Sequence, residues 1–483
     1  MPLRSSWWKK VREIAGDRVL TDAGAVEPYG HDEFTRDPSG ILPEAVVKPA
    51  DEGEVAAIVK ICRDEKVPLT VRGGGTGLVG GCIASPGGIV LSMELLNRVI
   101  DTDQANLTIT VQAGVSLKRL YEEVEKMSLY FPPHPGDEGA FVGGAVAANA
   151  GGARAVKYGT VRRFVLGLQV VLASGEVLDL GGKYIKSSSG YHLTDLMIGS
   201  EGTLGVITRI TLGLLPPVGS VQTILAPFST SRQAIDAVPA ILARGILPCA
   251  VEFVEHSVTR AVERLLNKTW PAREGAASLM IIVDGRDEED TLSQAQTIGE
   301  VLEAVGALDV LLTDQKGRQA EILEMRSMLY EGIRAATVEL FDVCVPRSEV
   351  AAHVTFVHDL EARLGVSLPT FGHAADGNVH THLLRGLLAD GIVGPDLPDW
   401  REKREQAREA IYDDVAGRGG VVSGEHGIGL TKRASFRRNL SLPHLSALQA
   451  IKKALDPDGI LNPGKIFEMS NKEELEQKRK DIL

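Results

Sequence analysis

Five side chains whose types suit metal binding and proton transfer gather in the C-terminal half of the chain. They are His373, His380, His382, Glu425 and His426. The segment 371–382 predicts two strands around an Asp-Gly turn, and alternate residues of a strand share a face. The hairpin therefore brings its three histidines towards one another, and the segment 423–429 adds a carboxylate and an imidazole between glycines. Two imidazoles and a carboxylate with open positions suit Zn, Mn or Fe, whereas a lone pair of histidines is more often structural.

Glycine is concentrated in three segments, and the first, Arg72–Gly88, contains eight glycines. Such density lets backbone N–H groups converge on an anion. Gly75–Gly80 formally matches the GxGxxG dinucleotide pattern, with Glu94 about twenty residues further on. That pattern requires a helix to begin at its third glycine, where Pro86 and two glycines would break it. No GK[ST] follows, so a P-loop is excluded as well.

Two further clusters of small residues occupy Pro135–Gly152 and Gly199–Thr208. Either cluster alone could reflect tight structural packing. Three such segments in one region indicate an extended ligand that lies along the backbone.

The composition limits the class of protein. The 483 residues include 52 basic and 64 acidic side chains, and the net charge of −12 is too acidic for a nucleic-acid binder. Hydrophobic residues make up 44%, enough for a core in each of two or three domains. The four cysteines form no CxxC pair, so we expect neither an iron–sulfur cluster nor a disulfide framework. The sequence has no apolar run of about eighteen residues, and we expect an untargeted, cytoplasmic protein.

Hydrophobic periodicity predicts the elements that must position these residues. In the N-terminal part, helices are expected over 4–16 and 51–64 and strands over 67–71, 89–93, 107–111, 164–172 and 204–212. These elements form an α+β domain, and the turn-rich stretch Pro216–Ser220 interrupts the pattern. Beyond it, strands over 279–283 and 342–345 alternate with helices over 231–243, 290–305, 348–364 and 400–418.

Six ordered motifs resemble the FAD-linked 2-hydroxy-acid dehydrogenases of the vanillyl-alcohol-oxidase superfamily. The branch that they resemble most contains the glycolate oxidase flavin subunit, D-lactate dehydrogenase and D-2-hydroxyglutarate dehydrogenase. The motifs are Val46–Pro49, Arg72–Gly77, Gly143–Gly152, Tyr158–Gly159, Ile198–Thr208 and Leu461–Lys465.

The resemblance implies an α+β fold with a PCMH-type FAD-binding domain of two subdomains. We expect that domain over 1–218, an α/β substrate (cap) domain with an antiparallel sheet over 219–440, and a C-terminal segment over 441–470 that returns to the FAD-binding domain. The remaining residues, 471–483, are expected to form a charged, solvated tail.

The resemblance also implies which residues bind FAD. The first glycine segment would bind the pyrophosphate, the other two would line the flavin and adenosine, and the C-terminal segment would return to the flavin. The implied FAD-binding residues are Arg72, Gly73, Gly74, Gly75, Thr76, Gly77, Leu78, Pro135, Gly136, Gly143, Gly144, Ala148, Ala150, Gly151, Gly152, Tyr158, Gly159, Glu201, Gly202, Gly205, Val206 and Asn462. Some members attach FAD through a histidine in the first loop. This loop has Thr76 instead, so we expect non-covalent FAD and interpret the nearby His134 as an ordinary loop residue.

The resemblance assigns roles within the histidine cluster. The family pattern Gly-His-x-x-Asp-Gly-Asn-x-His matches 372–380, and Glu-His-Gly matches 425–427. It implies one divalent metal (Zn, Mn or Fe) bound by His373, His380 and Glu425, with His426 as the base. Asn378 would contact substrate or flavin, and His382 would lie behind the ligands.

The implied reaction moves a hydride from the substrate Cα to flavin N5 while the hydroxyl loses its proton. A free hydroxyl has a pKa of about 15.7, and chelation by a divalent cation could lower it towards ~7–9. A neutral His426 could then accept the proton.

Basic residues for substrate carboxylates are scarce. Hydroxyglutarate-type relatives carry an Arg, a Thr and a Lys for this purpose, and most of these are missing from the corresponding stretch 330–342. Arg326, Arg334 and Arg347 remain as candidates, the first two as active-site residues. This loss favours a small acid such as D-lactate or glycolate.

The sequence contains neither an iron–sulfur motif nor a nicotinamide fingerprint, so electrons must leave to a separate acceptor. The family's precedents are an electron-transferring flavoprotein and an iron–sulfur subunit, and a quinone is the alternative acceptor. We expect a homodimer or hetero-oligomer, with access to the inner membrane only through a partner.

Two other classes of function stay open. One is a non-haem iron oxygenase or metal hydrolase that uses the same three ligands without a redox flavin, which leaves the glycine segments unexplained. The other is a catalytically silent flavoprotein subunit of an electron-transfer complex.

Overall fold

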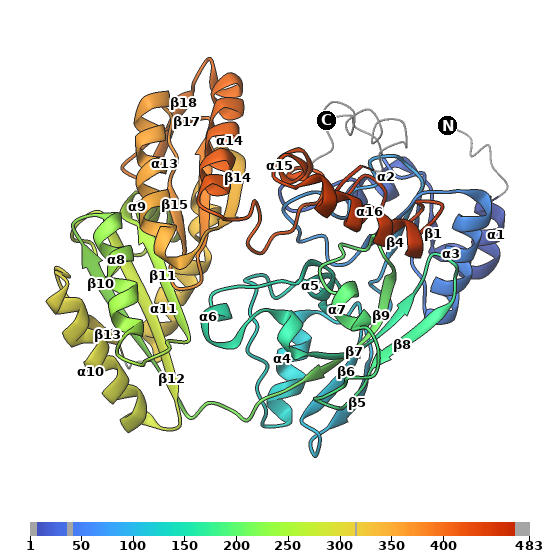
Figure 1. Cartoon of the computed structure of the whole chain (residues 1–483), viewed down its shortest axis with the longest axis horizontal. Coiled ribbons are helices and arrows are strands. Elements are labelled where there is room, and N and C mark those ends of the chain that lie inside the picture. Colours follow the sequence, from blue (N-terminus) through green and yellow to red (C-terminus); the bar gives the residue numbers. More distant parts are fainter. Residues whose placement is uncertain (1–6, 36–41, 314–315, 469–483) are drawn as a thin grey trace.

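The computed structural model describes residues 7–35, 42–313 and 316–468, and the charged tail predicted over 471–483 lies outside these ranges. Figure 1 shows two lobes. The first holds the N-terminal half of the chain together with the C-terminal helices, and the second holds the elements between them. Helices and antiparallel strands occur in both lobes, so the predicted α+β class is confirmed.

The first lobe begins with a four-stranded sheet in which three strands run parallel. Its order is β1 (Val19–Leu20), β2 (Ala45–Val47), β4 (Ile89–Ser92) and β3 (Leu69–Arg72). The accompanying helices are α1 (Trp7–Ala15), α2 (Ala23–Val26) and α3 (Glu52–Glu65). Asp51 caps α3 by accepting a hydrogen bond from the Glu54 N–H at 2.9 Å. The predicted apolar face of this helix, including Val55 and Cys62, is buried.

A five-stranded antiparallel sheet follows in the same lobe. Its order is β5 (Val99–Asp103), β6 (Thr108–Gln112), β9 (Val206–Gly213), β7 (Val165–Val171) and β8 (Val177–Gly181). The helices of this part are α4 (Leu117–Lys126), α5 (Val142–Ala148), α6 (Ala155–Tyr158) and α7 (Leu193–Met197). One continuous hydrophobic core joins this sheet to the four-stranded sheet. The second glycine segment thus contains a short helix, α5, which packs beside β9, the strand that begins within the third segment.

The second lobe is built on a seven-stranded antiparallel sheet. Its order is β13 (Leu311–Thr313), β10 (Ser220–Phe228), β12 (Ala277–Gly285), β11 (Ala250–Glu255), β15 (Thr370–His373), β16 (Asn378–Leu384) and β14 (Thr337–Cys344). One face packs against α8 (Ser231–Leu242), α10 (Glu288–Ala304), α13 (Val350–Leu364) and α14 (Trp400–Gly417). The other face packs against α9 (His256–Leu266), α11 (Lys316–Ser327) and α12 (Leu329–Ile333). Both faces are covered, so the central strands are apolar on both sides. A small hairpin, β17 (Gly386–Ala389) and β18 (Ile392–Asp396), stands apart.

The chain finally returns to the first lobe through α15 (Arg433–Arg438) and α16 (Leu442–Leu455). Leu461 lies beside Leu69 of β3 as an isolated parallel bridge. The Leu69 N–H donates to the Ile460 carbonyl at 2.8 Å, and the Asn462 N–H donates to the Leu69 carbonyl at 2.7 Å. The motif around Asn462 is therefore placed at the edge of the first sheet, next to the start of the first glycine segment.

Charged groups that are buried or partly buried support both the second lobe and its contact with the first. Asp414 of α14 accepts a hydrogen bond from His353 of α13 at 2.7 Å and pairs with Arg418 at 2.8 Å. Asp284, at the end of β12, accepts from Lys157 and from the Tyr158 hydroxyl of the first lobe. The helices of the described ranges include none that is long and apolar enough to cross a bilayer.

Candidate active site

The hairpin predicted over 371–382 is present, and it places the histidines as expected. Strands β15 and β16 pair so that Phe371 lies opposite His380 and His373 opposite Asn378. His373 and His380 are buried. The Glu425 Oε1 atom lies 3.6 Å from His373 Nε2 and 3.4 Å from His380 Nε2. The structure thus brings together the three predicted metal ligands.

The donor set of His373, His380 and Glu425 fits one metal ion. Metal–ligand distances of about 2.1 Å give a tetrahedral site with ligand–ligand edges of about 3.4 Å, close to the two separations observed. His373 donates through its other ring nitrogen, Nδ1, to Glu252 Oε1 at 2.5 Å, as histidines that bind metals usually do. Burial alone would raise the Glu425 pKa, but hydrogen bonds from the two histidines hold it well below its usual value. The carboxylate is therefore ionised, as a metal ligand must be.

Glu252 connects this donor set to Arg326. The Arg326 Nε atom donates to Glu252 Oε2 at 2.8 Å, and the carboxylate is fully buried. Burial alone would raise the Glu252 pKa, but the charges of Arg326 and His373 lower it to about 2. A permanent negative charge therefore lies behind His373.

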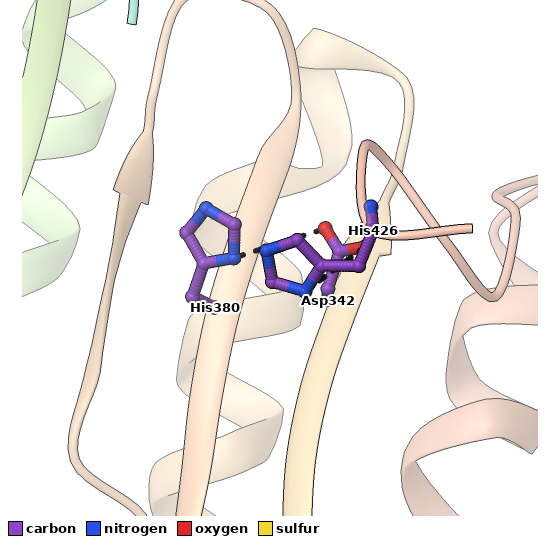
Figure 2. A group of neighbouring side chains, drawn as sticks. All are labelled: Asp342, His380 and His426. Carbon is purple, nitrogen blue, oxygen red and sulfur yellow. Dashed lines mark hydrogen bonds and ion pairs between the residues drawn. The ribbon is translucent and has the colours of Figure 1, made fainter. Parts of the chain in front are cut away.

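A second group consists of Asp342, His380 and His426 (Figure 2). Asp342 and His380 lie opposite each other on the neighbouring strands β14 and β16, whereas His426 comes from the loop beyond β18 and α14. The His380 and His426 rings stack with centroids 5.3 Å apart. The Asp342 Oδ2 atom lies 3.6 Å from His426 Nδ1.

Asp342 is already saturated with hydrogen bonds. It is fully buried and accepts from Asn378 Nδ2 at 2.7 Å, Ser423 Oγ at 2.8 Å and Lys432 Nζ at 3.0 Å. The backbone N–H of His426 also donates to it, at 2.9 Å. Because these donors occupy its oxygens, Asp342 suits the fixing of the loop better than the binding of a metal.

His426 is poised as a proton acceptor. Its side chain is 16% exposed, and its Nδ1 atom is buried without a hydrogen-bond partner in the described part of the chain. Burial lowers its pKa to about 4, so the ring is neutral at pH 7. A neutral imidazole at the edge of a cavity can take a proton from a bound substrate.

One cavity of about 810 Å³ joins this cluster to the glycine segments. Its volume lies in the upper part of the range of about 300–1,000 Å³ for ligand sites. Glu425, His426, Arg326 and Tyr330 line it from the side of the second lobe. The implied FAD-binding residues that line it are Gly73, Gly74, Gly75, Thr76, Gly77, Leu78, Pro135, Gly136, Gly143, Gly144, Ala148, Ala150, Gly151, Glu201, Gly202 and Gly205. All three glycine segments therefore face the same space.

One position of the first glycine loop, Gly75, requires glycine because the Arg72 side chain lies directly against it. A Cβ on Gly75, whose φ is +78°, would lie 2.1 Å from Arg72 Nη2. Arg72 itself donates to the His31 carbonyl at 2.6 Å and contacts Cys82 Sγ at 3.1 Å. The arginine thus holds the loop while the backbone faces the cavity.

The other implied FAD-binding residues lie outside the cavity wall: Arg72, Gly152, Tyr158, Gly159, Val206 and Asn462. Asn462 has a supporting place, since its Nδ2 atom donates to the carbonyls of Gly81 at 2.8 Å and Glu201 at 2.6 Å. It ties the first glycine segment to the third. Tyr158 instead reaches Asp284 in the other lobe.

The three candidate arginines have different surroundings in the structure. Arg326 lines the cavity, whereas Arg334 is absent from its wall and pairs with Glu33 and Glu331. Arg347 donates to the Ala375 carbonyl. Asn378 is likewise placed behind the site, because its Nδ2 atom donates to Asp342 and to the Val343 carbonyl at 2.9 Å.

The sequence interpretation missed Glu252, Asp342 and Lys432 as parts of the site. The first two are single carboxylates inside apolar strands, Ala250–Glu255 and Thr337–Cys344. Such an isolated charge in an otherwise buried run is the signal that could have found them. Lys432 follows a loop with no such pattern, and only the fold shows that it is buried against Asp342.

The two lobes, with a glycine-lined cavity and a cluster of acid–base and metal-binding groups in one wall, define a cofactor-dependent enzyme. Two family models match: an FAD binding domain over residues 43–181 and the C-terminal domain of FAD linked oxidases over residues 219–466. The chain belongs to the FAD-linked oxidase family and is an FAD-dependent oxidoreductase.

Curated relatives span nearly the whole chain. A D-lactate dehydrogenase of Archaeoglobus fulgidus is 39% identical over 90% of this chain and 94% of its own length. The glycolate oxidase subunit GlcD of Bacillus subtilis is 34% identical over 94% of this chain and 95% of its own. A solved structure, the 4-ethylphenol oxidase of Gulosibacter chungangensis, superimposes with a TM-score of 0.77 over 97% of both chains at 20% identity. The last likeness shows the fold, and the first two confirm the branch that the motifs indicated.

Proposed function

We propose that this enzyme oxidises a small D-2-hydroxy acid or glycolate to the 2-keto acid, with D-lactate as the favoured substrate. The observation that carries the proposal is that His426 and Glu425 line the same cavity as the three glycine segments. Relatives named D-lactate dehydrogenase and glycolate oxidase subunit support the substrate class.

FAD would lie along the glycine segments without a covalent bond. The first loop carries Thr76 and has no histidine through which FAD could be attached. When bound there, the flavin would accept the hydride from the substrate carbon. The backbone N–H groups of the loop and the bare surface of α5 fit a long ligand that approaches the main chain closely.

His373, His380 and Glu425 would hold one divalent cation, either Zn, Mn or Fe. The bound cation would polarise the substrate hydroxyl and help to orient it. Glu252 keeps the Nε2 atom of His373 directed towards Glu425, since it binds the opposite ring nitrogen at 2.5 Å. The chain thus supplies a preorganised set of two imidazoles and one carboxylate.

His426 would receive the hydroxyl proton at Nε2, which lies 3.7 Å from Glu425 Oε1, because Nδ1 faces Asp342. Asp342 holds the backbone N–H of His426 and lies 3.6 Å from its Nδ1 atom, so it orients the ring and stabilises the charge that develops. Arg326 would attract the substrate carboxylate from the cavity wall. Arg334 is engaged with Glu33, and we assign it no contact with substrate.

Electrons would then leave to a separate protein or to a quinone. The GlcD relative is named as a subunit, which supports a protein partner. Affinity purification of the native chain from its source, followed by mass spectrometry, would identify that partner by co-purification.

The substrate class can be tested by steady-state turnover with an artificial dye as electron acceptor. We expect D-lactate or glycolate to reduce the dye much faster than L-lactate or a D-2-hydroxy acid with a second carboxylate. Turnover with L-lactate alone, or with none of a panel of hydroxy acids, would contradict the proposal.

A further inference from the structure

Glu201 occupies a point where four segments of the chain meet. Its backbone is left-handed, with φ of +51°, although it is not glycine. Its N–H donates to the Ala147 carbonyl of α5 at 2.8 Å. Its carbonyl accepts from Asn462 Nδ2 at 2.6 Å. The main chain of this one residue therefore joins the second and third glycine segments to the C-terminal return.

The Glu201 side chain reaches the fourth segment, the loop Gly424–Gly429 that carries Glu425 and His426. Its Oε1 atom accepts from the Ile428 N–H at 2.8 Å, and its Oε2 atom accepts from the Gly429 N–H at 2.7 Å. A Cβ on Gly427 would lie 3.0 Å from Oε1, so the loop backbone rests directly on the carboxylate. Both oxygens are thus engaged by consecutive amides.

The loop is held from both lobes. From the second lobe, Asp342 accepts hydrogen bonds from the N–H groups of Glu425 at 3.2 Å and His426 at 2.9 Å. From the first lobe, Glu201 accepts hydrogen bonds from the N–H groups of Ile428 and Gly429. The Val79 carbonyl accepts from the Leu430 N–H at 2.8 Å. The position of His426 relative to the glycine segments is set between these two carboxylates.

We propose that Glu201 is a positioning residue that fixes the loop of Glu425 and His426 against the cofactor-binding lobe. This assignment rests on the proposed function, in which His426 is the base. It replaces the expectation that the Glu201 side chain contacts FAD, because a carboxylate whose two oxygens both accept from backbone amides offers no donor to an anionic cofactor.

The test compares Glu201→Gln and Glu201→Asp with Asp414→Asn as a matched control. Glutamine keeps the size of the side chain but directs an NH₂ group at one of the two amides, so one hydrogen bond is lost. Aspartate keeps the charge and both acceptors on a shorter chain. Asp414 is also a hydrogen-bonded carboxylate, partly buried with its side chain 10% exposed, but it lies between α13 and α14 and does not touch the loop.

Two readouts are needed: hydrogen–deuterium exchange of the peptide covering 424–430 in the FAD-loaded protein, and kcat and KM with D-lactate. For Glu201→Gln we expect faster exchange of this peptide and a fall in kcat of roughly 10- to 100-fold, with a smaller change in KM and normal FAD content. Glu201→Asp should recover part of the loss. Asp414→Asn should change neither readout.

Exchange that matches the wild type in both Glu201 variants would overturn the proposal, as would a kcat that falls no further than in Asp414→Asn. Loss of FAD content with normal loop protection would overturn it in favour of a cofactor contact. If the wild-type protein does not oxidise hydroxy acids, the proposed function fails, while the exchange measurement still decides whether Glu201 holds the loop. If Glu201→Gln does not fold, Glu201→Asp supplies the same comparison.

Discussion

At the scale of single residues, the site depends on buried charges that hold reactive side chains in place. Asp342 and Glu252 are each 0% exposed, and each is compensated by a basic partner, Lys432 or Arg326. Unpaired carboxylates at this depth would be too costly to retain. Glu252 lies behind His373, and Asp342 lies behind His426; the proposed chemistry uses both imidazoles.

His426 is the residue whose loss should affect turnover most specifically. His426→Gln should lower kcat about 10²- to 10⁴-fold, because a general base makes a contribution of that size. FAD content and KM should change little, which absorbance spectra and steady-state kinetics can check. His358→Gln is the control, since its side chain is 40% exposed and pairs with Glu255 away from the cavity. Retention of most turnover in His426→Gln would contradict the assignment of His426 as the base.

The metal can be tested separately from the base. Purified protein loaded with divalent cations should hold about one metal ion per chain by elemental analysis, and Glu425→Gln should hold much less. Glu303→Gln, on the exposed surface of α10, provides a control of the same chemistry. Activity that survives complete chelation would contradict metal assistance.

The sequence predicted the metal and base candidates because they lie in two short local motifs. The hairpin 371–382 fixes His373 and His380 through strand geometry alone. The assignments of Arg334 and Asn378 were weaker, because their partners come from distant segments. Arg334 meets Glu33 from the other lobe, and no local pattern encodes that pairing.

At the scale of elements, helix α5 contains two neighbouring glycines with different roles, one in packing and one in ligand binding. A Cβ on Gly143 would lie 2.6 Å from the Ala113 Cβ and 2.9 Å from its carbonyl oxygen. The neighbouring Gly144 has no atom within 4 Å of such a Cβ, and both glycines line the cavity.

This difference predicts opposite effects of the two alanine substitutions. Gly143→Ala should lower the melting temperature of the FAD-free protein through steric strain. Gly144→Ala should leave that temperature unchanged or raise it slightly, because alanine favours a helix by up to about 1 kcal/mol. Gly144→Ala should nevertheless weaken FAD binding, as measured by titration of the apoprotein. Unchanged FAD affinity would show that the cofactor does not pass over α5.

Helices α13 and α14 are joined by a charged contact whose effect depends on pH. Burial alone would raise the Asp414 pKa, but the hydrogen bond from His353 and the charge of Arg418 hold it below its usual value. The ionised carboxylate therefore stabilises the fold above an unfolded pKa of about 3.9, and this contribution is lost as the pH falls through the lower pKa of the folded protein.

Asp414→Asn should accordingly lower the free energy of unfolding by about 1–3 kcal/mol at pH 7. The difference from the wild type should shrink below about pH 4. Urea unfolding at several pH values can measure both. A difference that is constant from pH 7 to pH 3.5 would contradict this account of the contact.

The predicted elements agree with the structure where the apolar runs are long and buried. The helix expected over 290–305 is α10, which Asp287 caps by accepting from the Asp290 N–H at 2.9 Å. Strand β10 was not predicted, because it begins at Ser220, inside the turn-rich stretch that interrupts the periodic pattern. Strands β5 and β8 lie at the edges of their sheet with half their residues exposed, so their hydrophobic signal is weak.

At the scale of the whole molecule, the active site exists only where the two lobes meet. Each lobe contributes one wall of the cavity, and the return of the chain through α15 and α16 brings Asn462 back to β3. Asp284 and Tyr158 connect the lobes on another side. Local sequence patterns cannot encode such contacts, and here a family resemblance supplied what periodicity could not.

The central claim is that this shared cavity carries out hydride transfer from a D-2-hydroxy acid to flavin. The most direct measurement is anaerobic rapid mixing of the FAD-loaded, metal-loaded protein with D-lactate or glycolate, followed by the visible absorbance of the flavin. The account predicts that the flavin is bleached in the wild type and far more slowly in His426→Gln. A flavin that stays oxidised with a panel of D-2-hydroxy acids would contradict it.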